Sequence, residues 1–510
     1  MSVPPLKTLF GDIADAIRSK KETSSSIEAV NFPSEILSIP AGGSSTQPLD
    51  ESQPVVVWIY RDMVTGKDKV VRTNPVNGNA VPPSDAGNVQ ANAGENPALT
   101  FQGWNHSSQD MQNVTRDMCI GAMYITADSK THLYVSLNQA TGLSHTLNVR
   151  STAGNTVTID WGDGTPNDTF AGTGSAQTHT YANYGTYAVK VWVSAGTGNL
   201  LLGGGSSSTI VWGADVRARN DSLFAAFLGS AVQIQIYAFH YTKLRTISIP
   251  SGVASLNACA FYYCQSLTTV SIPSGVTSLG TSVFNSCFSL TTASIPSSVT
   301  SLEDNAFCGC YSLTTVTIPS NVTSLGTSLF NNCYSLTAIS IPSGITSIAL
   351  TMFTNCYSLT TVSIPSSVIS IGSGAFNNCY SLNAISIPSG VTSIGGSAFN
   401  NCQSLAAISI PSGVKSIASS TFSGCYSLTA ISIPSGVTSI ASNAFGNCHS
   451  LNSTTFNSIV PPTMTDVNTF SAMPASNNIY VPDASLNDYK TATNWIIHAY
   501  HIHPISELTA

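Results

Sequence analysis

Proline recurs with an unchanging step of 23 residues through the second half of the chain, and this repeat limits the folds that the chain can adopt. Phenylalanine keeps the same step from Phe261 and Phe284 to Phe445. A fixed period of this length, with Leu or Ile at set offsets, predicts a solenoid in which each unit forms one coil stacked on the next. The periodic prolines and cysteines are Pro250, Pro273, Pro296, Pro319, Pro342, Pro365, Pro388, Pro411 and Pro434, and Cys264, Cys287, Cys310, Cys333, Cys356, Cys379, Cys402, Cys425 and Cys448.

One unit, residues 290–312, shows how a coil can be built. Strand geometry places alternate side chains inward, so Ala293 and Ile295 are expected in the core and Ser294 in solvent. Pro296 then ends the strand, because proline has no N–H to donate to a ladder.

The same unit supplies two further inward pairs. Val299 and Leu302 form one, and Phe307 with Cys310, at helix-like i, i+3 spacing, closes the coil from another side. Each coil is thus predicted to bury one Leu, one or two Ile or Val, one Phe and one Cys.

The unit resembles the BspA-type leucine-rich repeats of bacterial surface antigens and phage tail proteins, with the pattern I-P-x-x-V-x-x-I-x-x-x-A-F-x-x-C-x-x-L. The resemblance covers residues 244–455. Residues 456–510, which include Ile479-Tyr-Val-Pro and Trp495, are similar to the segment that closes such arrays and are expected to form a C-terminal cap.

The periodic cysteines are predicted to be buried, reduced core residues. Cys behaves as a small hydrophobic residue. The chain has no C-x-x-C pair, and Cys308 with Cys310 lacks the spacing of a zinc site.

The N-terminus carries an amphipathic pattern that predicts a helix over residues 6–20. The apolar stripe consists of Leu6, Leu9, Phe10, Ile13 and Ile17. Together with Phe32-Pro-Ser-Glu-Ile-Leu-Ser-Ile39, this pattern resembles the N-terminal segment of tail proteins from phages of Gram-positive bacteria, which implies that residues 1–45 are a virion attachment segment and linker. The alternative is an ordinary helical hairpin.

Two further modules are predicted before the repeats. Residues 54–127, with Leu99-Thr-Phe-Gln-Gly-Trp-Asn105, resemble the β-grasp repeat of internalin-type and MucBP-like surface proteins. Residues 131–195, with Asp160-Trp-Gly-Asp-Gly164 and His179-Thr-Tyr181, resemble a PKD-type β-sandwich. Residues 209–243 are expected to form an irregular N-terminal cap of the solenoid. The fold class is therefore multi-domain and mainly β, with a short N-terminal helical segment.

Charge is scarce, which argues against catalysis and against nucleic acid as a partner. Charged residues are 8% of the chain and the net charge is −7, with no basic cluster. Between Thr246 and Val460 only Glu303, Asp304 and Lys415 carry charge, so a general acid/base pair is hard to assemble. We find no catalytic motif and expect a non-enzymatic protein without a cofactor, and no apolar segment is long enough to span a membrane.

Two places could be taken for metal sites. Asp160 and Asp163 are potential calcium ligands, but carboxylates in such turns more often accept hydrogen bonds from backbone amides. The histidines at 498, 501 and 503 lie in an expected terminal strand and are better explained as structural residues. No metal site is predicted.

Surface recognition is the remaining function, and two columns of the repeat could carry it. Tyrosines on a neutral scaffold offer sugars a flat apolar face and a hydroxyl, although the rings could instead stack on one another. A row of small hydroxyls on the long sheet could pack against another chain or a glycan. The candidate receptor-binding residues are Phe288, Tyr311, Tyr334, Tyr357, Tyr380 and Tyr426, and the hydroxyl row is Ser248, Ser271, Ser294, Thr317, Ser340, Ser363, Ser386, Ser409 and Ser432.

These features favour a phage tail fibre or receptor-binding protein located in the virion. Its N-terminus would bind other tail or baseplate proteins, and its distal modules a host cell-surface glycan or protein. The expected lack of a signal peptide favours this hypothesis over the alternative, a BspA-like adhesin on a bacterial cell surface. The sequence does not fix the oligomeric state, and a homotrimer is one state it allows.

Overall fold

The computed structural model describes residues 129–508 except 138–141, 153–154, 174–175, 196–197, 204–210, 213–221 and 231. Before residue 129 it describes four strands and positions 76, 79 and 80. The predicted apolar stripe at Leu6, Leu9, Phe10, Ile13 and Ile17 lies outside the described residues. The chain divides into two compact units, residues 1–253 and 254–510.

The first unit contains a four-stranded mixed sheet in the order β2-β1-β4-β3. Its strands are rich in β-branched and aromatic residues, which favour extended backbone. β1 pairs with β4 in parallel, whereas β1–β2 and β3–β4 are antiparallel. The strands are β1 (Val56–Arg61), β2 (Asp68–Thr73), β3 (Leu99–Trp104) and β4 (Met118–Thr126). The resemblance of this segment to a β-grasp repeat stays a prediction.

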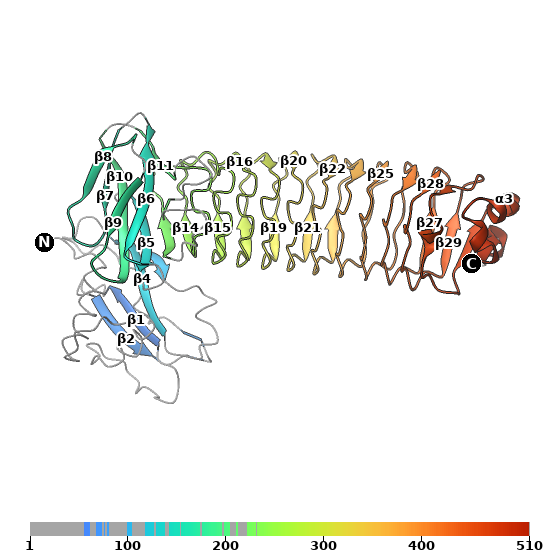
Figure 1. Ribbon diagram of the computed structural model, residues 1–510, viewed down its shortest axis with the longest axis horizontal. Helices are drawn as coiled ribbons and strands as arrows, with labels where there is room; N and C mark the ends of the chain where they lie inside the picture. Colours follow the sequence, from blue (N-terminus) through green and yellow to red (C-terminus); the bar gives the residue numbers. More distant parts are fainter. Residues whose placement is uncertain are drawn as a thin grey trace. The chain divides into compact units, whose positions relative to one another are not determined.

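Two further sheets of the first unit form a β-sandwich (Figure 1). One has the order β14-β12-β5-β10-β7-β8 and the other the order β13-β11-β6-β9. Trp161, which follows β7, and Trp212, which bridges to Leu147 of β6, are fully buried with ring centroids 6.3 Å apart. The strands are β5 (Thr131–Leu137), β6 (Ser144–Ser151), β7 (Thr156–Asp160), β8 (Asp168–Ala171), β9 (Ala176–Thr180), β10 (Gly185–Ala195), β11 (Leu200–Leu202), β12 (Leu223–Phe227), β13 (Val232–Ile234) and β14 (Thr246–Ser248).

The two sheets continue past residue 195, into the segment for which the sequence predicts an irregular cap. β11 pairs with β6, and β12 pairs with β5 and, in parallel, with β14. Buried Leu and Ala side chains such as Leu202 and Ala225 extend the core there. The apolar pattern of these strands is too short to distinguish them from a cap by sequence, because each has only three to five residues.

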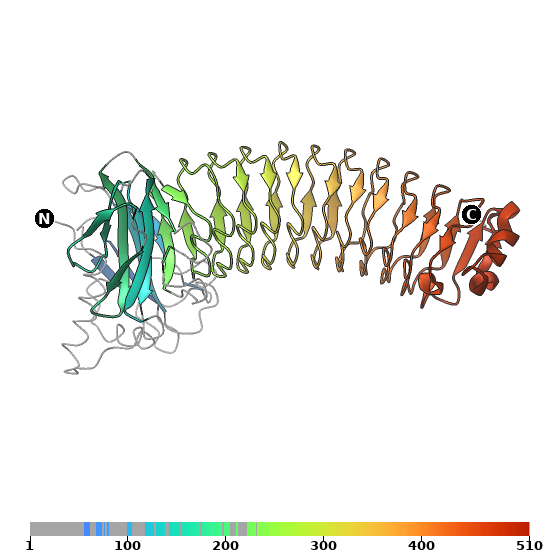
Figure 2. The same ribbon diagram turned by 45° about the horizontal axis from the view of Figure 1, so that its top comes forward.

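The second unit is the leucine-rich-repeat solenoid, as predicted, and Figure 2 shows the strands of its successive coils side by side. Most coils contribute a first strand whose middle residue is buried and whose flanking residues are exposed, such as β17 (Thr292–Ser294). Two successive coils have an isolated bridge there instead, between Ala384 and Ala407. Ala293 and Ile295 are buried and Ser294 is exposed, which confirms the predicted alternation. The other first strands are β15 (Thr269–Ser271), β19 (Thr315–Thr317), β21 (Ala338–Ser340), β23 (Thr361–Ser363), β27 (Ala430–Ile433) and β29 (Ser453–Phe456).

A turn connects each first strand to a second one. The carbonyl of Pro296 accepts a hydrogen bond from the N–H of Val299 at 3.1 Å, and the same bond recurs at each periodic proline. The second strands pair in parallel. Paired residues are equivalent positions of neighbouring repeats, 23 residues apart in sequence, as in Leu279, Leu302 and Leu325. They are β16 (Ser278–Leu279), β18 (Ser301–Leu302), β20 (Ser324–Leu325), β22 (Ser347–Ile348), β24 (Ser370–Ile371), β25 (Ser393–Ile394), β26 (Ser416–Ile417), β28 (Ser439–Ile440) and β30 (Thr463–Met464).

The third side of the coil buries Phe307 and Cys310, as their i, i+3 spacing predicts, but its backbone is not helical. Its N–H groups alternate between two kinds of partner. The N–H of Phe284 donates to the carbonyl of Ala306 in the next coil at 2.9 Å, whereas that of Cys287 donates to the carbonyl of Phe284 in its own coil at 3.2 Å. Because alternate bonds cross between coils, this side is a ladder of turns and does not form a helix.

This alternation requires two residues per coil with positive φ, for example Asn401 and Ser397. Asn and Gly, which adopt the left-handed region at low cost, fill most positions of one of these columns, whereas Ser is the commonest residue of the other. One of these columns is Tyr263, Ser286, Gly309, Asn332, Asn355, Asn378, Asn401, Gly424 and Asn447.

The core of the solenoid is organised around a ladder of stacked phenylalanine rings. Neighbouring ring centroids, beginning with Phe261 and Phe284, are 5.3–5.8 Å apart. Burying one Phe side chain contributes about 2–3 kcal/mol. The ladder ends at Phe470, beyond the last periodic residue Phe445.

The segment after the last repeat closes the exposed end of this core. It contains η3 (Val467–Phe470), β31 (Asn478–Val481), η4 (Asp483–Ser485), α3 (Leu486–Thr491), η5 (Ile496–His501), β32 (Ile502–Pro504) and η6 (Ile505–Glu507). Trp495 and Tyr489 are fully buried, with ring centroids 4.9 Å apart, and the Trp495 indole donates to the carbonyl of Pro462 at 2.8 Å. Of the described helices, none is long and apolar enough to cross a membrane.

Candidate functional site

The residue after each periodic cysteine lies at the same corner of successive coils, and we call this set the aromatic column. Five consecutive members form a stack of nearly parallel rings, with centroids 4.4–4.9 Å apart and interplanar angles of 2–10°. The rings of this five-ring stack are partly buried. They are Phe288, Tyr311, Tyr334, Tyr357 and Tyr380.

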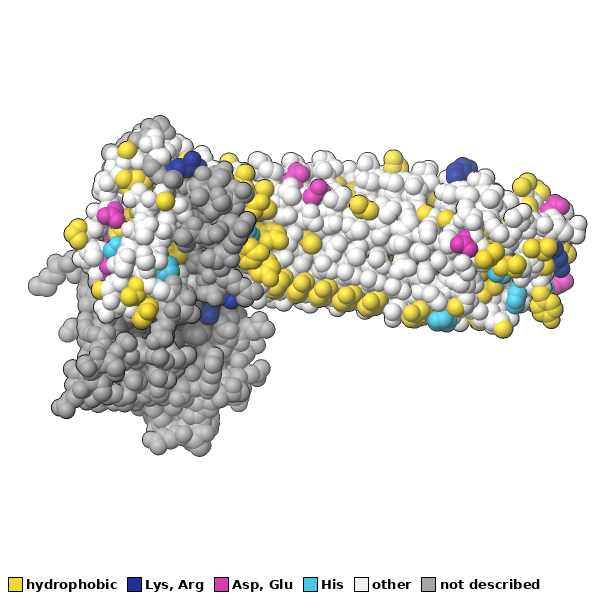
Figure 3. Space-filling view, viewed as in Figure 1, with side chains coloured by type: hydrophobic (Ala, Val, Ile, Leu, Met, Phe, Trp, Pro, Cys, Tyr) yellow, Lys and Arg dark blue, Asp and Glu magenta, His cyan; other side chains and the backbone are white. Residues whose placement is uncertain are grey.

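Stacking changes what the column can offer to a ligand. Inside the stack both faces of a ring are covered by its neighbours, so a ring such as Tyr334 presents only its edge and its hydroxyl. Burial, followed by the neighbouring Tyr311 and Tyr357, raises the pKa of Tyr334 above its ordinary value. Figure 3 shows a row of hydrophobic side chains along one edge of the repeats.

The stack is interrupted at Gln403 and resumes for two further members of the column. Tyr426 and His449 stack at 5.2 Å with an angle of 28°. Tyr426 is 39% exposed, and His449 is also exposed. The structure therefore brings five of the six candidate receptor-binding residues into one stack and places Tyr426 beyond the interruption.

Most of the row of small hydroxyls lies on the first strands, whereas Ser386 and Ser409 are exposed but lie outside the strands. Ser271, Ser294 and Thr317 occupy equivalent positions in parallel β15, β17 and β19, and each is exposed. The hydroxyl row is a polar, uncharged surface, because Glu303, Asp304 and Lys415 lie outside these strands.

The two candidate calcium ligands in the sandwich accept local hydrogen bonds. Asp160 accepts from the N–H of Gly162 at 2.9 Å, and Asp163 accepts from the N–H of Thr165 at 3.0 Å. Asp163 also pairs with Nε2 of His179 at 2.9 Å. Gly162 has φ +73°, and an added Cβ would lie 2.5 Å from a backbone oxygen, so only glycine fits this turn.

Comparison with known proteins assigns the second unit. Residues 232–360 and 346–473 match the family described as BspA type Leucine rich repeat region, in six copies. Residues 232–473 are BspA-type leucine-rich repeats. No curated protein sequence matches the chain.

Several solved structures are similar to the chain. A leucine rich cell surface protein from Faecalibacterium prausnitzii is 27% identical over 47% of this chain and 86% of that one, with a TM-score of 0.26. A leucine-rich repeat protein from Bacteroides ovatus is 24% identical over 55% and 84%, with a TM-score of 0.39. The pneumococcal vaccine antigen PcpA is 19% identical over 56% and 78%, with a TM-score of 0.38.

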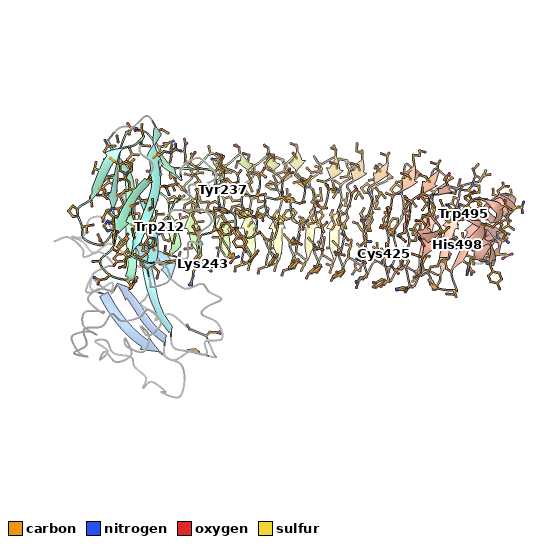
Figure 4. All side chains as sticks on the ribbon, viewed as in Figure 1. Trp212, Tyr237, Lys243, Cys425, Trp495 and His498 are labelled. Carbon is orange, nitrogen blue, oxygen red and sulfur yellow. The ribbon has the colours of Figure 1, made fainter. Side chains whose placement is uncertain are left out.

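The nine periodic cysteines of the BspA-type repeats are buried, which confirms the predicted core position. Burial raises the pKa of each periodic thiol from Cys287 to Cys448. It also raises the pKa of Cys308, which is partly buried and is not one of the periodic cysteines. Figure 4 labels one of them, Cys425, within the repeats. A protonated thiol surrounded by core side chains is chemically inert.

The three C-terminal histidines, which were considered as metal ligands, lie in different surroundings. His501 Nδ1 lies 3.0 Å from the carbonyl of Asn477, and His503 Nδ1 lies 3.2 Å from the carboxylate of Glu507. His498 is buried near Trp495 (Figure 4), and burial, followed by His501, lowers its pKa. Among the described residues, no group of three or more His, Cys, Asp or Glu side chains could hold a metal ion. His498 and His501 lie in η5, which corrects the expectation that all three share a terminal strand.

Two features of the BspA-type repeats and their cap were not predicted from the sequence. The asparagine side chains at 332, 355, 378 and 401 form a ladder of amide hydrogen bonds 2.7–2.9 Å long. Asn or Gly directly before the periodic Cys is the signal that could have indicated it. The cap also exposes Ile459, Val460, Ile496, Ile497 and Tyr500, whose irregular spacing gives no such signal.

Proposed function

We propose that the protein is a non-enzymatic adhesin that displays its BspA-type repeats at a bacterial cell surface. The observation that carries the proposal is the surface of the repeats, which combines the aromatic column with an uncharged hydroxyl row. Uncharged hydroxyls and tyrosine edges can form many hydrogen bonds with a glycan or a protein without the cost of removing water from charged groups.

The scarcity of charge supports the non-enzymatic part of the proposal. Glu303, Asp304 and Lys415 are the charged residues between residues 246 and 460, and all three are exposed. A general acid and base need neighbouring groups with suitable pKa values. The BspA-type repeats offer no such neighbouring pair beyond the adjacent carboxylates of Glu303 and Asp304.

A phage tail fibre is the second candidate, and one observation favours it. Residues 6–39 resemble the N-terminal segment of phage tail proteins. In that case the stripe at Leu6, Leu9, Phe10, Ile13 and Ile17 would bind other tail or baseplate proteins, and the distal modules would bind the host surface. The resemblances to β-grasp and PKD modules fit either candidate, because such modules space or present other domains.

Localisation of the full-length protein tests both candidates. Immunogold electron microscopy with an antibody against the repeats should label the envelope of intact, uninfected cells if the protein is a surface adhesin. Label confined to phage particles would contradict the first candidate and support the second. The purified full chain should also bind cells or their wall glycans, and absence of binding to either would contradict an adhesive function.

A further inference from the structure

The five-ring stack has two unlike ends. At one end, Tyr263 and Phe288 form an edge-to-face contact, with centroids 5.3 Å apart and an angle of 69°, so another aromatic ring lies against the terminal ring. At the other end, one face of Tyr380 is covered by Tyr357 at 4.9 Å. The opposite face of Tyr380 is turned toward the next coil, where the column has Gln403 instead of a ring.

Backbone hydrogen bonds fix the positions of the residues around this interruption. The N–H of Ser404 donates to the carbonyl of Tyr380 at 3.1 Å, and the N–H of Ser427 donates to the carbonyl of Gln403 at 3.0 Å. Tyr380, Gln403 and Tyr426 are therefore consecutive steps of the column. Between Tyr380 and Tyr426 the column therefore has one amide side chain, that of Gln403, which is partly buried.

We propose that this interruption is a carbohydrate-binding subsite, in which Tyr380 and Tyr426 contact the apolar face of a neutral pyranose and the Gln403 amide hydrogen-bonds its hydroxyls. The proposal rests on the adhesive function proposed above and names the class of ligand. A pyranose needs an open ring face for its C–H groups and nearby amide or hydroxyl groups for its hydroxyls. Within the aromatic column, the interruption supplies both.

Exposure supports this position over the rest of the column. Tyr426 is exposed, whereas every ring of the five-ring stack is partly buried. Tyr426 is also less regularly stacked than the rings of the five-ring stack, since its angle to His449 is 28°. A ligand that moves the Gln403 side chain aside does not have to separate two stacked rings, as it would elsewhere in the five-ring stack.

The charge of the surroundings selects a neutral sugar. No Asp, Glu, Lys or Arg occurs between Asp304 and Lys415. Lys415 precedes β26 on another side of the coil. The column contains no Lys or Arg, so a sialylated or phosphorylated sugar would find no permanently charged cation there.

The test uses the full chain and saturation-transfer NMR with lactose, maltotriose and chitotriose, with sialyllactose as the charged comparison. Gln403→Tyr should fill the interruption with a ring and weaken binding of the neutral sugars by at least about tenfold. The matched control is Gln265→Tyr, the same substitution in the same column at a coil where Tyr263 already contacts the neighbouring ring of Phe288. The control should bind as the wild type does.

Tyr426→Ser should also weaken binding by about tenfold, because it removes one of the two ring faces. Circular dichroism melts identify a variant that has lost its fold, and the Gln403→Tyr variant, which restores the repeat pattern, should not melt earlier than wild type. Wild-type protein that binds none of the neutral sugars, or Gln403→Tyr protein that binds them unchanged, would overturn the subsite. If the wild type still binds cells in either case, the adhesive function stands and only the subsite fails.

Discussion

The thiol of Cys333 donates a hydrogen bond to the carbonyl oxygen of Phe307, 26 residues earlier, at 3.2 Å. The same bond recurs along the repeats, from Cys287 to Cys448, at 3.2–3.3 Å. Each thiol therefore fills core volume and also links one coil to the preceding one. This double role is a physical reason for Cys at a position that a purely apolar residue could also fill.

The buried thiols should resist alkylation in the native protein. Burial blocks the reagent, and the raised pKa values keep thiols such as Cys333 and Cys379 protonated at pH values where free cysteine reacts. Iodoacetamide followed by peptide mass spectrometry should find these residues unlabelled in buffer and labelled in denaturant. The partly buried Cys259 and Cys308 are the internal controls and should label faster. Equal native labelling of both groups would contradict this prediction.

Phe470 should be essential to the C-terminal cap. Its ring stacks on Phe445 at 5.3 Å and closes the phenylalanine ladder. Phe470→Ala should lower the free energy of unfolding by about 3–5 kcal/mol, as for other buried phenylalanines. Val467→Ala is a matched control in the same short helix, because Val467 is 45% exposed, and it should change stability by less than about 0.5 kcal/mol. Urea unfolding measures both, and equal effects would show that the ladder does not extend into the cap.

Asn378 should be replaced at lower cost by Gly than by Ala. Its φ is 61°, and its side chain donates to Asn355 at 2.7 Å and accepts from Asn401 at 2.9 Å. Both variants lose the amide ladder, but only Ala is strained at positive φ, by about 1 kcal/mol. Thermal melts should therefore give a higher melting temperature for Asn378→Gly than for Asn378→Ala. The repeats already have glycine at equivalent positions, Gly309 and Gly424. The opposite order would mean that the backbone relaxes there.

The β-sandwich should lose stability in acid through Asp163. Burial alone would raise the pKa of Asp163, but hydrogen bonds from Thr165 and His179 outweigh it, so the net pKa lies below its ordinary value. A carboxyl group with a lowered folded-state pKa stabilises the fold above the unfolded pKa of about 3.9, and this stabilisation is lost as the pH falls through the folded pKa.

Hydrogen exchange of peptides from residues 156–187 should therefore accelerate as the pH falls below about 4, after correction for intrinsic exchange. Asp163→Asn, which cannot ionise, should show a weaker dependence over the same range. An unchanged dependence in the variant would assign the effect to other carboxylates.

Much of the solenoid follows from the sequence alone. A strict 23-residue step forces equivalent residues into register, so the inward positions of Ala293, Ile295 and the periodic cysteines are set by pattern. Terminal elements are less predictable: Phe470 follows Phe445 by 25 residues, so it falls outside the period although it continues the ladder.

The tertiary structure alone decided what the regular columns present to solvent. The sequence placed tyrosines one coil apart but left open whether their faces were free, because that depends on side-chain orientation between coils. With centroids 4.4–4.9 Å apart the rings of the five-ring stack cover one another, and the interruption at Gln403 leaves Tyr380 without a stacked ring on the side of the next coil. Likewise, β11 and β12 join the sandwich through pairing with distant strands, β6 and β5, and three to five residues of local pattern cannot specify such a partner.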